Sequence, residues 1–145
     1  MTLTMMLSPD FNLEQSLAIQ TITSATATNG TGVDVSKYRN LDLVVHVSAP
    51  LSTTDDTVTF TVEHSYDNTT FVAVTAADLV DRDGNASTFT VGTDAVAVDE
   101  ILFLRRTGNL RRYVRVVATT TGAAAVSISF GAWIGGLYQL TEEGS

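Results

Sequence analysis

The sequence predicts an all-β protein, an antiparallel β-sandwich, jelly roll or barrel of eight or nine strands. Apolar and polar residues alternate with period two through most of the chain, which is typical of strands that bury one face. Threonine and valine are abundant, and their β-branched side chains favour strands. Clusters of Gly, Asn, Asp and Ser recur at short, regular intervals and predict the turns between the strands.

Nine segments carry the strand pattern. They are residues 18–28, 41–47, 57–63, 70–75, 87–91, 95–98, 101–104, 113–119 and 125–134. In the second segment, one face consists of Leu41, Leu43, Val45 and Val47. In the third, the residues expected to point inward are Val58, Phe60 and Val62. In the eighth, Val114 and Val116 lie on the face opposite to Arg115.

Little of the chain favours a helix or a second domain. Residues 11–18 are weakly amphipathic and residues 76–80 are compatible with one helical turn, but neither segment would hold a helical domain together. We therefore expect a single β-sandwich domain over residues 17–140, which is an ordinary domain size. Residues 1–16 are expected to form an N-terminal arm, and residues 141–145 a frayed C-terminal tail.

Composition excludes several classes of protein. The net charge of −8 repels phosphate backbones and anionic lipid, so we expect no nucleic-acid partner. We also expect no membrane partner, because no run of about 18 apolar residues is present and the first residues lack a signal-peptide pattern. The absence of cysteine excludes disulfides, thiolate catalysis and Cys-ligated zinc.

Catalytic groups are scarce in this sequence. It contains two histidines, His46 and His64, and we expect both at exposed or edge positions without a role. No nucleophile elbow and no His-Glu-x-x-His motif is present. The sequence therefore predicts a protein that is not an enzyme and needs no cofactor.

One turn has a weak likeness to a metal loop. Asp81, Asp83 and Asn85 alternate as the first three ligands of an EF-hand loop do. The pattern then fails, because Ala86 stands at the glycine position and Gly92 at the position of the bidentate glutamate. A polar β-turn is the favoured interpretation, and weak calcium binding is the alternative.

Arginines gather in one short stretch. Five of the eight basic residues lie there, namely Arg105, Arg106, Arg111, Arg112 and Arg115. If residues 101–106 and 111–117 form the arms of one hairpin, like charges meet at its tip and need carboxylates, either Asp99 and Glu100 or those of another subunit. Structural ion pairs, docking to another protein and nucleic-acid binding all remain open for this cluster.

Three further residues are candidate contacts with another protein. Trp133 falls on the face of its strand that otherwise carries Ser and Gly. Either that strand is buried on both faces, or Trp133 anchors a subunit interface, where Trp and Arg are enriched. Phe11 and Leu13 are the candidates within the N-terminal arm.

Three segments carry a family resemblance. They are GVDVSKYRNLDLVVHV, TVTFTVEHSYDNTTFVAVTAADLV and RRYVRVVATTTGAAAVSIS, which together span roughly residues 32–130. The VD-S-Y entry into an alternating strand, the V-HS-D-TTF hairpin and the RYVRV strand resemble small all-β virion proteins of tailed bacteriophages, of the head decoration (cement) type. The usual Asp-Gly of that hairpin is Asp67-Asn68 here.

The resemblance implies a jelly-roll-like sandwich, often trimeric, attached to the outside of a capsid. We therefore expect a cement protein that is made in the host cytoplasm and resides on the exterior of the virion. Its expected partners are the major capsid protein and its own copies in a homotrimer, so that several weak contacts act together. The alternatives are a tail or head–tail connector component and a carbohydrate-binding β-sandwich module.

Overall fold

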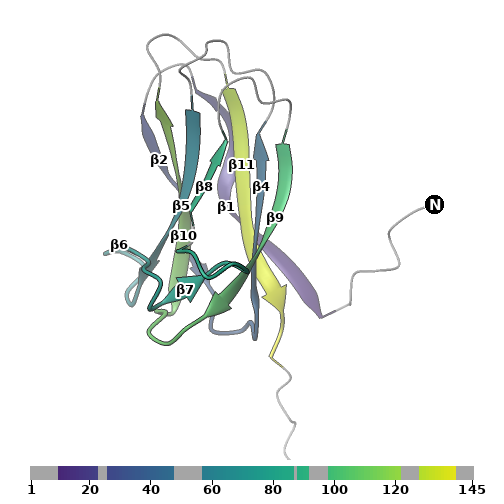
Figure 1. The fold of residues 1–145 in the computed structure, drawn as a ribbon, viewed down its shortest axis with the longest axis vertical. Coiled ribbons are helices and arrows are strands. Elements are labelled where there is room, and N and C mark those ends of the chain that lie inside the picture. The colour runs from purple at the N-terminus through teal and green to yellow at the C-terminus, as the bar shows by residue number, and fades with distance from the viewer. Residues whose placement is uncertain are drawn as a thin grey trace, which may run out of the picture.

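The computed structural model describes residues 10–22, 26–47, 57–86, 88–91, 98–121 and 128–139. These residues form two facing antiparallel sheets without a helix, which confirms the predicted β-sandwich (Figure 1). The strands are β1 (Phe11–Ile22), β2 (Ala27–Asn29), β3 (Val33–Asp34), β4 (Leu41–Val47), β5 (Thr57–Ser65), β6 (Val72–Ala73), β7 (Leu79–Val80), β8 (Thr88–Val91), β9 (Val98–Arg106), β10 (Tyr113–Thr121) and β11 (Ile128–Leu137).

The strand order is that of a jelly roll. The five-stranded sheet has the order β1-β11-β4-β9-β7, and the six-stranded sheet has the order β2-β10-β5-β6, with β3 also paired to β10 and β8 to β5. The main pairs are nested: β1 with β11, β2 and β3 with β10, β4 with β9, and β5 with β8. These pairs alternate between the two sheets, as in a long hairpin wrapped into a sandwich.

The core lies between the sheets and is built from the alternating residues that the sequence predicts. Leu41, Leu43, Val45 and Val47 of β4 are at most 2% exposed, and so are Val58, Phe60 and Val62 of β5, and Val114 and Val116 of β10. Phe60 and Phe130 meet edge to face across the two sheets, with ring centroids 6.0 Å apart. Burial of one face per strand therefore fixes the register of both sheets.

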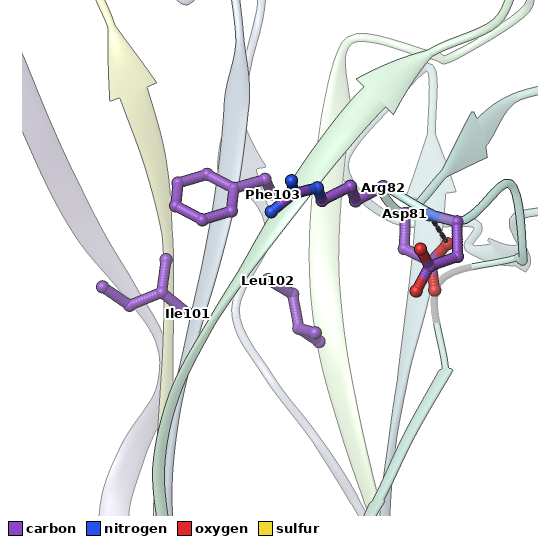
Figure 2. A pocket seen from close by; sticks show the side chains of 6 residues that line it. Asp81, Arg82, Ile101, Leu102 and Phe103 are labelled. Atoms are coloured by element: carbon purple, nitrogen blue, oxygen red, sulfur yellow. Dashed lines mark hydrogen bonds between the residues drawn. The ribbon is translucent and has the colours of Figure 1, made fainter.

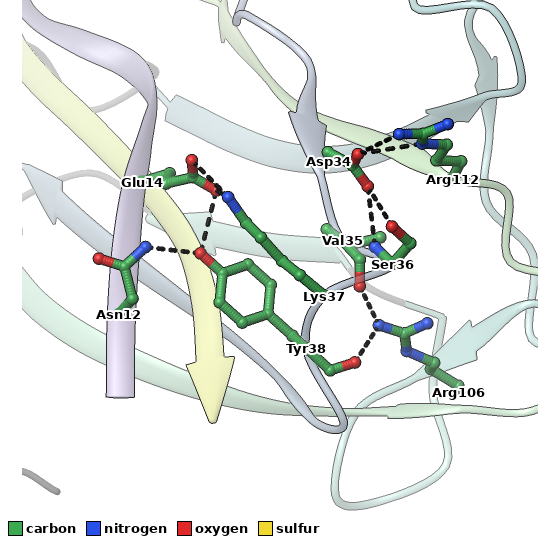
Figure 3. Close-up of polar contacts among 9 residues, drawn as sticks. All are labelled: Asn12, Glu14, Asp34, Val35, Ser36, Lys37, Tyr38, Arg106 and Arg112. Carbon is green, nitrogen blue, oxygen red and sulfur yellow. Dashed lines mark hydrogen bonds and ion pairs between the residues drawn. The ribbon is translucent and has the colours of Figure 1, made fainter. Parts of the chain in front are cut away.

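The predicted helical character of residues 11–18 is wrong, because these residues belong to β1. β1 runs antiparallel to β11 from Phe11 onward, with register shifts between Gln15 and Leu17 and again between Leu17 and Gln20. Polar contacts also hold its first half: Asn12 donates to the Tyr38 hydroxyl at 2.6 Å, and Tyr38 donates to Glu14 at 3.0 Å (Figure 3). Residues 11–16 are therefore part of the five-stranded sheet and not of an arm.

The predicted arginine hairpin is also wrong. β9 ends at Arg106 in the five-stranded sheet, whereas β10 begins at Tyr113 in the six-stranded sheet. The connection between them crosses from one sheet to the other, so their arginines do not face each other across a strand pair (Figure 1).

The remaining sequence predictions concern a turn before β7, the two ends of the chain and residues 95–97. Residues 76–78 form a turn before β7, in which the amide of Leu79 donates to the Thr75 carbonyl at 3.0 Å. Residues 1–9 of the predicted arm, the predicted tail at 141–145 and residues 95–97 lie outside the described residues. Among the described residues there is no helix of the length and apolarity that a membrane span requires.

Candidate interaction surface

The outer faces of the two sheets differ in chemistry. The outer face of the six-stranded sheet is polar and carries Thr59, Thr61, Glu63, Arg115 and Thr119, all partly exposed. This is the usual arrangement for an antiparallel sheet with one side in water. The five-stranded sheet departs from it.

Apolar side chains follow one another across the outer face of the five-stranded sheet. Ile101 on β9, Val44 on β4 and Trp133 on β11 lie side by side in register. Phe103 lies two residues after Ile101 on the same face of β9. Ile19 belongs to β1, at the opposite edge of the sheet. We call these five residues the apolar face. Ile19 is 60% exposed, Phe103 59% and Ile101 54%.

Glycine makes the packing of this face possible. A Cβ atom at Gly131 would lie 2.9 Å from the Ile19 Cγ1 atom and 3.2 Å from the Trp133 ring. Gly131 therefore provides the space in which Ile19 and Trp133 lie together. Gly135 makes room for the main chain at the start of β1, because a Cβ atom at this position would overlap the Asn12 backbone.

The size of the apolar face is what distinguishes it from scattered surface leucines or valines. At about 150–200 Å² for a large apolar side chain, the exposed parts of Ile19, Ile101 and Phe103 amount to roughly 300 Å². The partly exposed Val44 and Trp133 add to this area. The total approaches the apolar area on one side of a standard protein interface, about 450 Å².

One carboxyl group is buried at the margin of the apolar face. Asp42 lies on the outer side of β4 between Phe103 and Gly135, and it is 5% exposed. Its carboxylate accepts one long hydrogen bond, 3.3 Å, from the Asn40 side chain. Burial raises the pKa of Asp42, and the Asn40 contact partly offsets this rise.

Two of the predicted interface arginines form ion pairs within the chain. Arg112 donates to the Asp34 carboxylate through Nε at 3.0 Å and Nη2 at 2.8 Å (Figure 3). Arg115 binds Glu63, its direct neighbour across the β10–β5 pair, at 2.7 Å. The Arg112 guanidinium lowers the pKa of Asp34 to about 2. The carboxylates paired with these arginines are therefore not Asp99 and Glu100.

Aromatic rings cover two of the guanidinium groups. Arg115 lies 4.2 Å from the centroid of Phe71, and Arg111 lies 4.6 Å from that of Tyr66. These cation–π contacts add to the ion pair of Arg115 and hold the guanidinium group of Arg111 over an aromatic ring. Both arginines therefore have structural roles in the six-stranded sheet.

Arg106 holds a corner of the fold. Its Nη2 atom donates to the main-chain carbonyls of Val35 and Tyr38, at 2.5 and 2.7 Å (Figure 3). Val35 and Tyr38 are fully buried, and Arg106 adds to the bonds that their carbonyls accept from the Tyr38 amide at 3.2 Å and the Gln139 side chain at 3.5 Å. The Nε atom of Arg106 is buried without a hydrogen bond among the described residues, and burial lowers the pKa of this arginine.

Arg105 differs from the other four arginines. Its side chain is exposed and makes no hydrogen bond or ion pair with the side chains that the structure describes, and its main chain pairs with Val80 of β7. Of the remaining predicted contacts, Trp133 lies on the outer face of its strand as expected, and it is partly exposed. Phe11 and Leu13 pair with the end of β11, opposite Leu137 and Gly135.

The two histidines occupy different environments. His46 lies on the outer side of β4 and is partly exposed, in agreement with its predicted position. His64 is buried at 3% exposure, which corrects the expected exposed or edge position. Its Nδ1 atom accepts a hydrogen bond from the Arg111 amide at 3.4 Å, and burial lowers its pKa.

The segment 81–85 is a polar turn. Asp81 Oδ1 accepts hydrogen bonds from the amides of Asp83 and Asn85, both at 2.9 Å, and Gly84 has a φ of 89°. Two backbone amides thus bind one oxygen of this carboxylate, as in an Asx turn. Within the described ranges, no three His, Asp or Glu side chains gather as a metal site would require.

A small pocket lies where this turn approaches β9. Its volume is about 230 Å³, and it is lined by Asp81, Arg82, Asp83, Ile101, Leu102 and Phe103. Leu102 points toward the turn, whereas Ile101 and Phe103 lie on the other side of the strand (Figure 2). The pocket therefore opens beside the edge of β9 and borders the apolar face.

Comparison with known proteins identifies a shared fold. No protein-family model and no curated protein matches the chain. Among solved structures, the crystal structure of the PBSX exported protein XepA is similar, with a TM-score of 0.54 and 12% identity over 92% of this chain. The chain spans 40% of the length of XepA. At this identity the likeness shows the fold alone.

Proposed function

We propose that this protein is a structural component of a tailed bacteriophage that decorates the outside of the head and stabilises it. The observation that carries the proposal is the apolar face, which leaves Ile19, Ile101 and Phe103 more than half exposed. The largest apolar patch on a soluble monomer is typically about 300–600 Å² and is often functional, which makes this face the candidate contact surface. The partner in this proposal is the major capsid protein.

The distribution of polar residues supports an orientation on the particle. The apolar face would lie against the capsid, and the Thr-rich outer face of the six-stranded sheet would face solvent. Several copies held on one particle would turn modest individual contacts into stable attachment. The role requires a rigid body and a fitting surface, and it requires no catalysis.

The structural likeness to XepA supports a phage origin. That neighbour is an exported protein of PBSX, and it contains a region with the same fold. Independently of this likeness, the strand and turn patterns of the sequence resemble virion proteins of tailed bacteriophages. A position on the tail or the head–tail connector is the rival location, because the same apolar face would serve there.

Co-sedimentation with purified phage particles tests the proposal. The wild-type protein should pellet with tailless heads that lack it, and Ile19→Asp should reduce the bound fraction at least about tenfold, because it puts a charge in the contact. Thr61→Asp, on the outer face of the six-stranded sheet, is the matched control and should bind as wild type does. Wild-type protein that pellets with isolated tails and not with heads would overturn the head location.

A further inference from the structure

One histidine is buried beside the connection between the two sheets. His64 lies near the end of β5, on the side of the strand that faces the core, and it is 3% exposed. Its neighbours across the strand pairs are Val114 of β10 and Val72 of β6. Neither valine offers a polar side chain, so the imidazole depends on other elements for its hydrogen bonds.

The connection from β9 to β10 contacts this histidine. Residues 107–112 cross from the five-stranded sheet to the six-stranded sheet (Figure 1). Within them the Arg111 amide donates to the Nδ1 atom of His64 at 3.4 Å, and Leu110 packs partly buried against the core. We call residues 108–111 the crossover segment. Its main chain is thus tied to His64.

Other main-chain bonds fix the two ends of this connection but not its middle. At the start, the Thr107 amide donates to the Asp78 carbonyl at 3.1 Å. At the end, the Arg112 carbonyl accepts a bond from the Val35 amide at 2.9 Å. Among the described residues, the bond to His64 is the one hydrogen bond that the main chain of the crossover segment makes. Loss of this bond therefore frees the segment between two anchored ends.

Two charged groups of opposite sign face the imidazole. Asp78, in the turn before β7, is 9% exposed, and its Oδ2 atom already accepts two hydrogen bonds of 2.8 Å from the same turn. The second group is the Arg111 guanidinium. The ion pair of Arg115 and Glu63 lies on the outer side of β10 and β5, and β6 carries no charged residue. Burial lowers the pKa of His64, Asp78 partly offsets this effect, and Arg111 adds to it.

We propose that protonation of His64 in mildly acidic solution releases the crossover segment while the two sheets stay in place. In the neutral imidazole Nδ1 is an acceptor, whereas both ring nitrogens of the imidazolium are donors. The Arg111 amide then faces another donor and loses its partner. The positive ring also lies beside the Arg111 guanidinium. Opening of the segment lets water solvate both groups, which removes this conflict.

The release changes the surface at this end of the six-stranded sheet. In the closed state the Arg111 guanidinium lies 4.6 Å from the centroid of the Tyr66 ring, and Tyr66 is 71% exposed. In the open state this contact is lost, Leu110 leaves the margin of the core, and a short segment with a free arginine becomes accessible. This device involves no residue of the apolar face and does not depend on attachment to a capsid.

The sign of the pH dependence follows from the direction of the pKa shift. In the open segment His64 binds a proton with the ordinary pKa of 6.5, and in the closed segment it does so only at a lower pH. The closed state is therefore fully stable above about pH 6.5, and its stability declines as the pH falls toward the lowered pKa. Over this range the open state becomes up to about tenfold more frequent per pH unit.

Hydrogen exchange resolved by residue tests the release. After correction for the intrinsic rate, exchange of the Arg111 amide should accelerate about fivefold or more between pH 7.5 and pH 5, relative to the Val45 amide. Val45 lies in β4 between β9 and β11, so its exchange reports unfolding of the sandwich. Equal acceleration of both amides would show that acid unfolds the domain as a unit. That result, or no acceleration at Arg111, would overturn the proposal.

Two substitutions at His64 separate titration from packing. His64→Asn keeps an acceptor near the position of Nδ1 but does not titrate, so relative exchange at Arg111 should no longer depend on pH. His64→Leu removes the acceptor, so the segment should exchange at pH 7.5 at least as fast as the wild type does at pH 5. His46→Asn, on the outer side of β4, is the matched control and should respond to pH as the wild type does. A wild-type pH response in His64→Asn would show that another group controls the segment.

An NMR titration of the wild type keeps the test decisive if a variant does not fold. The ring signals of His64 should titrate below pH 6.5, and the Arg111 amide signal should shift with the same midpoint. A midpoint at or above 6.5, or an Arg111 amide that does not follow the ring, would refute the inference. None of these readouts involves phage heads, so a protein that fails to bind heads can still show the release, and the reverse also holds.

Discussion

Replacing Ser16 by alanine should destabilise the protein by about 2 kcal/mol. Ser16 is 3% exposed and lies at the first register shift of β1. Its hydroxyl donates to the Thr31 carbonyl at 2.9 Å and accepts from the Val116 amide at 2.9 Å. One hydroxyl thus connects β1 in the five-stranded sheet with β10 in the six-stranded sheet.

The magnitude follows from what the substitution leaves behind. Val116 is fully buried, so its amide would lose its partner and cost about 1–3 kcal/mol. Thr31 is exposed, so water replaces the lost bond to its carbonyl at little cost. At about 2 kcal/mol, the melting temperature should fall by roughly 4–8 °C for a chain of this length.

Urea unfolding of wild type and Ser16→Ala measures this difference, with Ser36→Ala as the matched control. The Ser36 hydroxyl bonds to Asp34 at the surface, so its loss should change stability by about 0.5 kcal/mol or less. Hydrogen exchange at the Val116 amide should accelerate in Ser16→Ala. A loss below about 0.5 kcal/mol in Ser16→Ala would show that this hydroxyl does not tie the sheets together.

Two further predictions concern residues that the sequence singled out or that pair with them. The pKa of Asp34 is lowered from 3.8 to about 2, so its pairing stabilises the fold above about pH 4, and this contribution is lost as pH falls toward 2. Asp34→Asn should therefore lower the free energy of unfolding by about 1 kcal/mol at pH 7. Between pH 4 and 2 the variant should lose less stability than the wild type. Parallel acid-unfolding curves of the two proteins would contradict this. Arg106→Met should lower stability by about 2 kcal/mol, because the buried carbonyls of Val35 and Tyr38 each lose a hydrogen bond from a charged donor. Thermal unfolding checks it, and an unchanged melting temperature would show that these bonds do not hold the corner.

The strands that could be predicted are those with uninterrupted alternation. In β4, and in β5 as far as Val62, each inward residue is apolar, and the structure buries them as expected. The first half of β1 was not predicted as a strand, because two register shifts break the alternation around Leu17, whereas residues 18–22 fall within the predicted strand 18–28. Leu13 and Leu17 are then four residues apart, a spacing that mimics a helix face, although Leu13 is exposed and Leu17 is in the core.

The candidate site was predictable in parts. The alternation of β11 correctly placed Trp133 on the outer face, but only the sheet order brings it beside Val44, Ile101 and Ile19. The partners of Arg112 and Arg115 lie 78 and 52 residues away in the chain, so no local pattern could reveal them. A local sequence pattern also does not distinguish a hairpin from a crossover between sheets. The hairpin interpretation therefore placed the arginines of β9 and β10 opposite each other.

Electron cryo-microscopy of phage heads decorated with this protein tests the central claim most directly. We expect density on the outer surface of the head in which the five-stranded sheet faces the shell and Ile19 and Trp133 lie at the contact. Density in which the six-stranded sheet faces the shell, or density on the tail alone, would contradict it.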